Sequence, residues 1–349
     1  MSSNQLSPVW LATGGSAVVL AAAGACGPGP ASPGPVTSPS PAAPPPTTAA
    51  LPTASAPGAN TTTAAAAPTP SATATAHAKP CPDDMVYVDG TYCTDWRRRC
   101  LKSENERSNH LTICHRFAEE QSCVGTRRRQ RFCIDRYEYP SRKNAHPPVM
   151  VSAYDAAALC ADKGKRLCWE SEWIAACEGP KGLPFPYGYE RDNEKCNIDR
   201  PWRKPSLSKV HSSNRAVQAP ELARLDQSVR SGSMESCQSD YGVFDLTGNQ
   251  DEWVLTERKR GTSEWVGLKG GNWHHVRNAC RPMTTSHAAQ WSYYFVSFRC
   301  CKSPDPQGVE PILPADGKPA LWTPPPAPTP PPPMGGKLHR GWTPDGPTP

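Results

Sequence analysis

The chain has 349 residues, and its 38 lysines and arginines against 32 aspartates and glutamates give a formal net charge of +6. So small an excess over this length does not by itself call for a nucleic-acid partner. Fifteen cysteines are too many for a reducing cytosol unless they bind metal, and the paired C-x2-C spacing of zinc fingers is absent. The composition therefore predicts an oxidising compartment and a framework of disulfides.

Residues 1–26 are expected to be a signal peptide. The apolar run Val9 to Ala25 is uncharged, but it is short for a membrane span, which needs about 20 apolar residues. It ends in Ala-Gly-Ala before Cys26, which is similar to a bacterial lipobox, so Cys26 is the expected lipidation site. This predicts a lipoprotein of the bacterial outer membrane or cell surface. The alternatives are a periplasmic or secreted protein and, third, an internal cytosolic start.

Proline marks the borders of the folded part. Of 42 prolines, 30 lie in residues 27–80 and 304–349. The first stretch is expected to be a disordered tether rich in polyproline II structure, with a reach on the order of 150 Å. The second is expected to be a disordered tail that contacts a partner. Residues 81–303 are long enough for one domain.

The domain is predicted to open with a strand over Met85–Gly90, because apolar residues alternate there, followed by a turn. A loop-rich, charged insertion is expected over Cys93–Cys123. A second strand is expected over Arg131–Pro140. Lys181–Ser236 has little periodicity and is expected to be ordered loop.

Two short helices are predicted. The first covers Ser152–Ala161, with Ser152 as a possible N-cap and Asp155 three residues later. The second covers Glu170–Cys177, closed by a following glycine and proline.

The stretch Leu268–Arg281 was expected to carry the functional site. Gly270 and Gly271 allow a tight turn or a close backbone approach. Trp273 supplies a large apolar anchor, and Cys280 follows. The alternative interpretation is a buried strand end with a structural cysteine.

Eight motifs occur in a fixed order across residues 81–302. They are MVYVDG (85–90), FCIDRYEYP (132–140), PVMVSAYDAAALC (148–160), GKRLCWESEWIAACEG (164–179), PYG (186–188), YGVFDLTGNQDEW (241–253), LKGGNW (268–273) and SFRC (297–300). Together they resemble the formylglycine-generating enzyme, or sulfatase-modifying factor, family. The resemblance implies an α+β, loop-rich and disulfide-braced domain of the C-type-lectin-like kind.

The resemblance also implies an activity: a copper-dependent oxidation of a sulfatase cysteine to formylglycine, with copper held by two cysteines. Two soft thiolates suit Cu(I). The second position of this pair falls on Cys280, but the first falls on His275. These two are the tentative catalytic residues. Because the two-thiolate centre is lost, copper is not expected to be a cofactor.

Three disulfides follow from the resemblance. Family members join the cysteine that ends the first helix to that of the SFRC motif, which implies Cys160–Cys300. The family partner of Cys177 falls near Thr285 in this chain, so Cys280, the nearest candidate, is expected to take its place. Cys168 and Cys301 remain to pair with each other.

The family also binds structural calcium through two sites of oxygen ligands. The matching residues in this chain are Asn197, Ile198, Gly248, Asn249, Gln250 and Glu252. The alternative is that Asn249 and Glu252 only bond backbone amides. Asp251 stands where the family usually has tryptophan, and it is expected either to strengthen the cation site or to face solvent.

These observations favour an exported, non-catalytic binding or scaffold module. Its expected partner is an envelope protein, a peptide or a glycan, with no nucleic acid and membrane contact only through the lipid anchor. The alternative is a copper-dependent oxidase of the formylglycine-generating type acting on sulfatase cysteines. An envelope protein with a purely structural role is a third possibility.

Overall fold

The computed structural model describes residues 79–106, 111–274, 277–309, 321–328 and 341–345. The chain divides into the units Met1–Ser71 and Ala72–Pro349, and all described residues belong to the second. The expected signal peptide, Cys26, nearly all of the tether and His275 lie outside the described residues. Among the residues that are described, no helix has the length and apolar character needed to cross a membrane.

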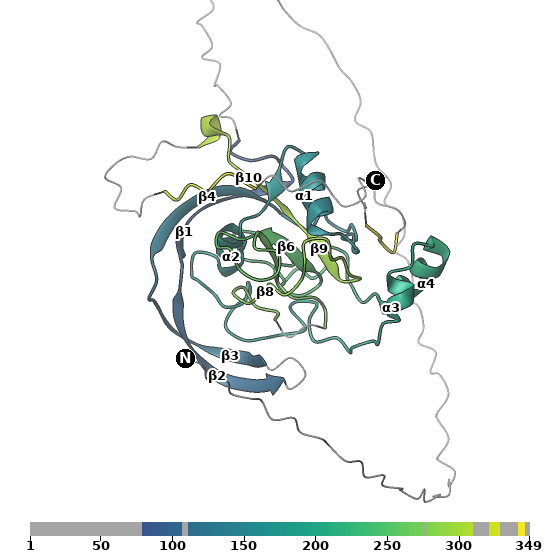
Figure 1. Ribbon diagram of the computed structural model, residues 1–349. Helices are drawn as coiled ribbons and strands as arrows, with labels where there is room; N and C mark the ends of the chain where they lie inside the picture. Colours follow the sequence, from purple (N-terminus) through teal and green to yellow (C-terminus); the bar gives the residue numbers. More distant parts are fainter. Residues whose placement is uncertain (1–78, 107–110, 275–276, 310–320, 329–340, 346–349) are drawn as a thin grey trace, which may run out of the picture. The chain divides into compact units, whose positions relative to one another are not determined.

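The first sheet has four strands in the order β1-β4-β10-β5 (Figure 1). Their bounds are Met85–Cys93 for β1, Arg127–Asp135 for β4, Arg166–Leu167 for β5 and Cys300–Lys302 for β10. The turn expected after Gly90 is wrong, because β1 stays paired with β4 as far as Cys93. Gly90 instead lets the Tyr241 side chain pack closely against the β1 backbone, because a Cβ at this position would overlap the Tyr241 hydroxyl.

Between β1 and β4 the chain forms a separate antiparallel hairpin of β2, Trp96–Glu106, and β3, Leu111–Cys123. The loop-rich insertion expected here is therefore wrong. Most side chains of β2 are exposed, so the strand lacks the apolar alternation that reveals a half-buried strand in a sequence. Two disulfides, Cys93–Cys123 and Cys100–Cys114, fasten the hairpin. They supply a constraint that a two-stranded hairpin needs, because such a hairpin is only marginally stable in water.

The second sheet has the order β8-β7-β6-β9. The bounds are Asp251–Leu255 for β6, Val266–Lys269 for β7, Met283–Thr284 for β8 and Val296–Phe298 for β9. Every residue of β6, β7 and β9 is buried. The main apolar cluster forms around this sheet, with Trp253 and Phe298 among its largest side chains.

Helices α1 and α2 match the two predicted helices closely. α1, Ala153–Ala161, begins with a capping box: the Ser152 hydroxyl accepts from the Asp155 N–H at 3.2 Å, and the Asp155 carboxylate accepts from the Ser152 N–H at 3.1 Å. α2, Glu170–Glu178, ends at Gly179, which has a φ of 63°. The α+β, loop-rich and disulfide-braced fold class expected from the sequence is confirmed.

Two further helices lie where only loop was expected. They are α3, Leu207–Val210, and α4, Arg215–Leu225. α4 was missed because Pro220 stands inside it and removes a backbone donor. Its anchor is apolar packing, since Leu222 and Leu225 are buried in one cluster with Val210 of α3.

The described parts of the C-terminal region contact the domain. A 3-10 turn, η1, covers Pro306–Gly308. Further on, the Trp322 N–H donates to the carbonyl of Arg129 at 2.7 Å. Trp342 exchanges two backbone hydrogen bonds with Val149, both of 2.9 Å. Proline content alone did not predict these contacts, because they depend on single tryptophans.

Candidate functional site

The Gly-Gly segment after β7 makes a tight turn against α2 and the loop before β6. Gly270 and Gly271 have φ angles of 86° and 68°. A Cβ on Gly270 would come within 2.9 Å of the Leu246 carbonyl, and one on Gly271 within 2.7 Å of the Asn278 amide. Only glycine fits both the angles and the space. Asn278 then donates to the carbonyl of Asn272 at 2.8 Å and closes the loop.

Cys280 is fully buried and is bonded to Cys177 of α2. Its backbone N–H donates to the carbonyl of Pro184 at 3.0 Å. A sulfur in a disulfide has no thiolate to offer Cu(I), so this residue does not fit a copper ligand. His275, the other tentative catalytic residue, lies outside the described residues.

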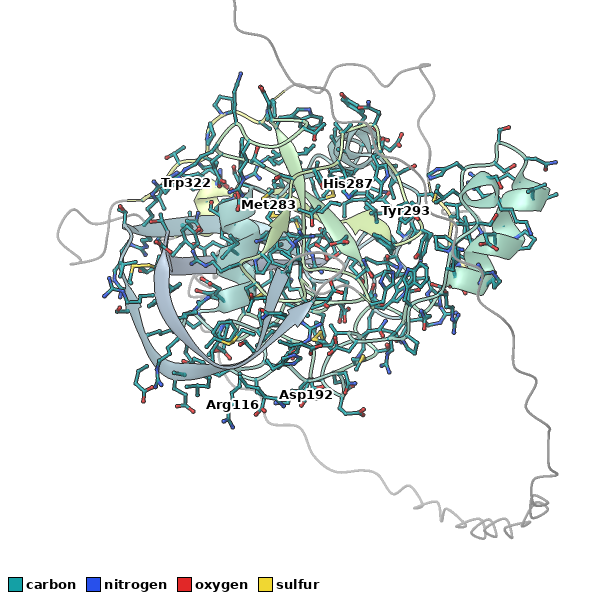
Figure 2. All side chains as sticks on the ribbon, turned by 60° about the horizontal axis from the view of Figure 1, so that its bottom comes forward. Arg116, Asp192, Met283, His287, Tyr293 and Trp322 are labelled. Carbon is teal, nitrogen blue, oxygen red and sulfur yellow. A yellow bond between two sulfur atoms is a disulfide. The ribbon has the colours of Figure 1, made fainter. Side chains whose placement is uncertain are left out.

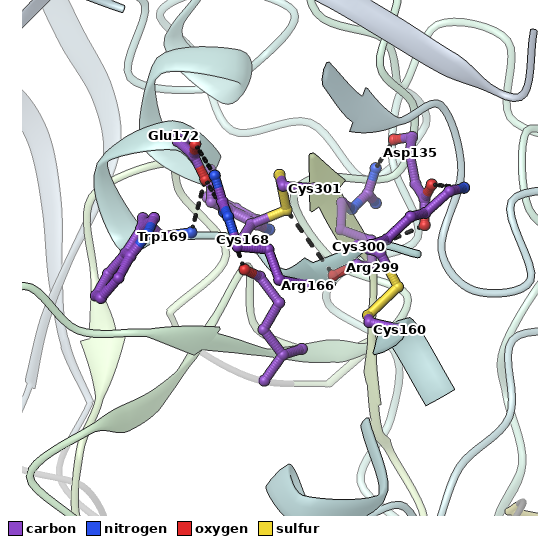
Figure 3. The surroundings of a disulfide bond; sticks show 12 residues. Asp135, Cys160, Arg166, Cys168, Trp169, Glu172, Arg299, Cys300 and Cys301 are labelled. Carbon is purple, nitrogen blue, oxygen red and sulfur yellow. Dashed lines mark hydrogen bonds and ion pairs between the residues drawn. A yellow bond between two sulfur atoms is a disulfide. The ribbon is translucent and has the colours of Figure 1, made fainter. Parts of the chain in front are cut away.

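Both remaining predicted pairs are joined as well: Cys160 with Cys300, and Cys168 with Cys301 (Figure 3). Cys300 and Cys301 are neighbours on β10, so their side chains leave the strand on opposite faces. One ties the strand to α1 and the other ties it to the residue after β5. In the described part of the chain, fourteen cysteines form seven disulfides.

The neighbouring residue His274 is partly buried against aromatic rings. Its Nε2 lies 3.3 Å from the Tyr294 hydroxyl. Burial lowers the pKa of His274, which favours the neutral imidazole at pH 7.

A cavity of about 440 Å³ opens beside Cys280. Its hairpin wall carries Trp96, Ile113 and Phe117, and its opposite wall consists of Pro184–Phe185 and Ala279–Pro282. Rings and aliphatic groups face each other across this gap, which we call the hairpin cleft. Its size and mostly apolar walls fit the general character of ligand pockets.

A buried ion triad holds the two walls together. The Glu178 carboxylate, whose side chain is 3% exposed, accepts from Arg98 of β2 at 2.7 Å and from Arg281 at 2.6 and 2.7 Å. Arg281 also donates to the carbonyls of Cys93 and Thr94 at the base of the hairpin. A buried charge needs such partners. The triad therefore fixes the hairpin, α2 and the Cys280 segment as one unit, and the cleft is preformed.

A second, more open cavity of about 840 Å³ lies on the other side of β3. Arg116, Glu190 and Asp192 are among its mostly charged lining residues, and Figure 2 shows Arg116 and Asp192 close together at the rim of the molecule. The segment around Glu190 pairs with β3 through a backbone hydrogen bond from Phe117 to Tyr189, of 2.9 Å. This cavity is built from solvated charges, whereas the hairpin cleft is built from apolar walls.

Lys269 is a buried cation that sequence reasoning did not single out. Its Nζ donates to the Arg281 carbonyl at 2.8 Å and lies 5.3 Å from the centre of the Trp173 ring. Burial lowers the pKa of Lys269 to about 7. The sequence did contain a signal for this site, namely a lysine at the end of the apolar strand β7. A lysine is rarely buried unless it has a specific partner.

Asp251 is buried, so it does not face solvent, which was one of the two positions expected for it. Its carboxylate accepts from the Asn272 side-chain amide at 3.1 Å. Burial raises the pKa of Asp251 to about 7. Since Asn272 follows the glycine pair, this bond helps to hold the Gly-Gly segment.

The expected calcium ligands Asn197, Ile198, Gly248 and Asn249 lie together. A Cβ on Gly248 would overlap the Asn197 carbonyl and the Ile198 side chain, so these segments touch. Asn249 Oδ1 accepts from the Asn197 amide at 3.0 Å and from the Val229 N–H at 2.8 Å. The two expected sites thus share one hydrogen-bonded loop junction.

The side-chain oxygens of Asn249 and Glu252 are already engaged. Glu252 accepts from Arg299 at 2.6 and 2.7 Å and from the Trp173 indole at 2.8 Å, with both charged side chains fully buried. The side-chain amide of Gln250 is buried without a hydrogen-bond partner among the described residues. Those residues contain no group of three or more His, Cys, Asp or Glu placed to hold a metal. The oxygens of Asn249 and Glu252 are thus occupied by protein donors in this arrangement, and calcium stays a prediction.

Sequence reasoning found three of the seven disulfides, but it missed the buried charges around the Cys280 segment. Glu178, Arg98 and Lys269 are charged, and in a sequence a charge predicts exposure. Glu178 and Arg98 are buried where the hairpin meets α2, and Lys269 is buried against Trp173 of α2 and the Arg281 carbonyl. Both contacts join segments distant in the chain.

The sequence profile of the sulfatase-modifying factor enzyme 1-like domain matches residues 89–304. Among curated proteins, the chain is 31% identical over 166 residues to "Inactive C-alpha-formylglycine-generating enzyme 2" of Bos taurus, a match covering 44% of this chain and 49% of that protein. The protein of the same name from Mus musculus is 29% identical over 169 residues, covering 45% and 49%. The chain thus spans about half the length of these relatives.

Two solved structures are also similar in fold. CarF has a TM-score of 0.39 and 16% identity, covering 64% of this chain and 99% of CarF. PvdO from Pseudomonas aeruginosa has a TM-score of 0.37 and 16% identity, covering 64% and 97%. The profile match spans well over half of the chain and contains the Gly-Gly segment, six of the seven disulfides among the described residues and nearly all of both four-stranded sheets. The chain belongs to the sulfatase-modifying factor enzyme 1-like family.

Proposed function

We propose that this chain is a non-catalytic member of its family, which uses the hairpin cleft to bind a peptide. The observation that carries the proposal is the buried Cys177–Cys280 disulfide. The family reaction, as the sequence resemblance implies it, needs two thiolates on copper. Here one of the two positions is His275 and the other has no free thiol.

The names of two relatives point the same way. Both mammalian matches carry the word inactive in their names. A family member that has lost its reaction can retain the surface that held the substrate, because binding and chemistry depend on different groups.

A peptide suits the cleft for two reasons. The apolar walls from Phe117, Phe185 and Pro282 can bury one or two side chains. The Glu178 triad holds the walls in place, so binding costs little reorganisation.

We also propose that the domain works outside the cytoplasm, on a chain anchored through Cys26. Seven disulfides among the described residues support an oxidising compartment. Residues 27–80 then act as a tether that projects the domain from a membrane surface, and membrane contact is through the lipid alone.

The deciding experiment measures thiols and copper on the full chain. Mass spectrometry after blocking of free thiols should find Cys177 and Cys280 bridged. Titration with Cu(I) under non-reducing conditions should give no stoichiometric site. A blocked, unbridged Cys280 together with one tightly bound Cu(I) per chain would overturn the proposal in favour of the oxidase.

The exposed pair Cys100–Cys114 provides a matched control. Mild reduction should open it before the buried Cys177–Cys280 pair, because a thiolate must reach the bridge to exchange with it. If Cys280 is released first, the bridge is labile and a thiol function returns to consideration.

A further inference from the structure

The tripeptide Trp-Thr-Pro occurs twice after the family domain ends, at residues 322–324 and 342–344. Both copies lie against the domain, and both use the same device: the tryptophan backbone bonds to the domain and its indole packs on an apolar cluster. The strand pairing differs, since the first copy forms a parallel bridge and the second an antiparallel one. A tripeptide that docks twice through its tryptophan nevertheless indicates a recognition element rather than an accident of one contact.

The second copy is held by strand-like pairing. Trp342 N–H donates to the Val149 carbonyl, and Val149 N–H donates to the Trp342 carbonyl, each at 2.9 Å. Gly341 precedes it with a φ of 82°, and a Cβ there would come within 2.8 Å of both Pro148 Cβ and the Val149 carbonyl. Glycine is therefore required at this position of the docked segment.

Side chains add specificity at the same place. The Trp342 indole packs against the cluster that contains Val149, Met150 and Tyr294. Thr343 is 5% exposed. Asp345 makes a bidentate pair with Arg230 at 2.7 and 2.8 Å. Because both charged side chains are 46% exposed, this pair orients the segment more than it stabilises it.

The first copy docks elsewhere. Trp322 N–H donates to the Arg129 carbonyl at 2.7 Å, and Leu321 forms a parallel bridge with Arg129. Trp322 packs on the main cluster around the second sheet. Figure 2 shows Trp322 well separated from Tyr293, which borders the second docking place. The domain thus has two separate sites for the same short motif.

We propose that the groove beside Val149 is a binding site for an extended Gly-Trp-Thr-Pro-Asp peptide, and that the chain's own residues 341–345 fill it as a releasable ligand. Backbone pairing with one buried anchor side chain is a common way of binding an extended peptide. The contact consists of one backbone bridge, one indole and one exposed ion pair. An attachment this small opens more easily than the core.

Docking of residues 341–345 also affects the Gly-Gly segment, because both contact the same apolar cluster. The cluster under Trp342 also contains Trp273, the residue two places after Gly271. When the tail segment leaves, this cluster loses its cover on one side. Docking of the tail thus braces the loop that ends at Cys280.

The test uses the full-length chain and a fluorescent peptide of residues 340–347, RGWTPDGP. Wild-type chain should bind the peptide at least about tenfold more weakly than the Trp342→Ala chain, because in the wild type the tethered segment competes at high effective concentration. The same peptide with its tryptophan changed to alanine should not bind the variant. Trp202→Ala is the matched control, since Trp202 is 62% exposed, and it should behave as wild type.

Equal binding to wild type and to Trp342→Ala, binding of the alanine peptide, or no binding to either chain would each overturn the proposal. If circular dichroism shows that Trp342→Ala does not fold, Gly341→Ala takes its place. That change strains the docked backbone without removing any side chain from the apolar cluster.

Discussion

The two walls of the hairpin cleft are built by different physical means. The wall that carries Cys280 rests on a buried sheet, a tight glycine turn and a bridge to α2 that joins residues 103 apart. The hairpin wall has mostly exposed side chains in β2 and is fastened by bridges that join residues 30 and 14 apart. The Glu178 triad and the edge-to-face contact of Phe117 with Phe185 are among the contacts that join the two walls.

Because of this difference, the amino-acid sequence of one wall can change more freely than that of the other. The Cys280 wall belongs to the core, so changes in it act on the stability of the whole domain. The hairpin wall is held by its disulfides, by the Glu178 triad and by hydrogen bonds from Gln121 to the carbonyls of Lys181 and Gly182. Its outward side chains take no part in these contacts and are free to define a ligand.

Removing the buried bridge by Cys177→Ser with Cys280→Ser should lower the free energy of unfolding by about 4–5 kcal/mol, as expected for a closed loop of about 100 residues. Removing Cys100–Cys114 by the same double change should cost less, about 3 kcal/mol at most for its short loop. Denaturant unfolding of the two variants measures both values. Equal losses would mean that the hairpin is as much a part of the core as α2.

Glu178→Gln should destabilise the domain by about 3 kcal/mol, because it leaves Arg98 and Arg281 without their buried counter-charge. It should also weaken peptide binding to the cleft, because the ion triad that connects the two walls is lost. Glu235→Gln is the control: its side chain is 83% exposed beside Lys143, and it should have almost no effect. A stable Glu178→Gln variant would show that the walls are held independently.

Asp251→Asn should flatten the dependence of stability on pH. Burial raises the pKa of Asp251 from 3.8 to about 7, so its stabilising contribution is complete below about pH 4 and is lost as the pH rises through 7. The wild type should therefore lose more melting temperature than the variant between pH 5 and pH 8. Glu119→Gln, on the exposed hairpin, should follow the wild-type curve. Parallel curves for Asp251→Asn and wild type would place the titration elsewhere.

Chelation should have the smallest effect. Because Arg299 and Trp173 engage the Glu252 carboxylate, adding EGTA should shift the melting temperature by less than about 1 °C, since little binding energy is lost. A clear drop that calcium reverses, and magnesium does not, would show that the loop junction rearranges around the ion. That result would restore the calcium sites expected from the sequence.

Much of the core could be predicted from the sequence because its signals are local. The capping box at Ser152, the glycine after α2 and the alternation in β1 each act within a few residues. The order of the eight motifs supplied the family, and with it three of the seven disulfides among the described residues.

The hairpin and α4 could not be predicted in the same way. β2 has no buried face to impose alternation, and Pro220 contradicts a helix that tertiary packing nevertheless stabilises. The buried charges Glu178 and Lys269 depend on contacts between distant segments. Local patterns carry no information about such contacts, so the shape of the cleft became visible only in the fold.

The neighbouring cysteines of β10 have a consequence for how the chain matures. Cys300 and Cys301 face opposite sides of the strand and close rings with residues 140 and 133 positions earlier. If the strand were displaced by one residue, each sulfur would face the wrong partner. The two bonds can therefore form together only when the strand is in its correct register. Neither bond can form until this strand, near the C-terminal end of the domain, has been made, so both bonds close late. A thiol–disulfide isomerase is the natural helper for any chain that pairs Cys160 with the wrong neighbour.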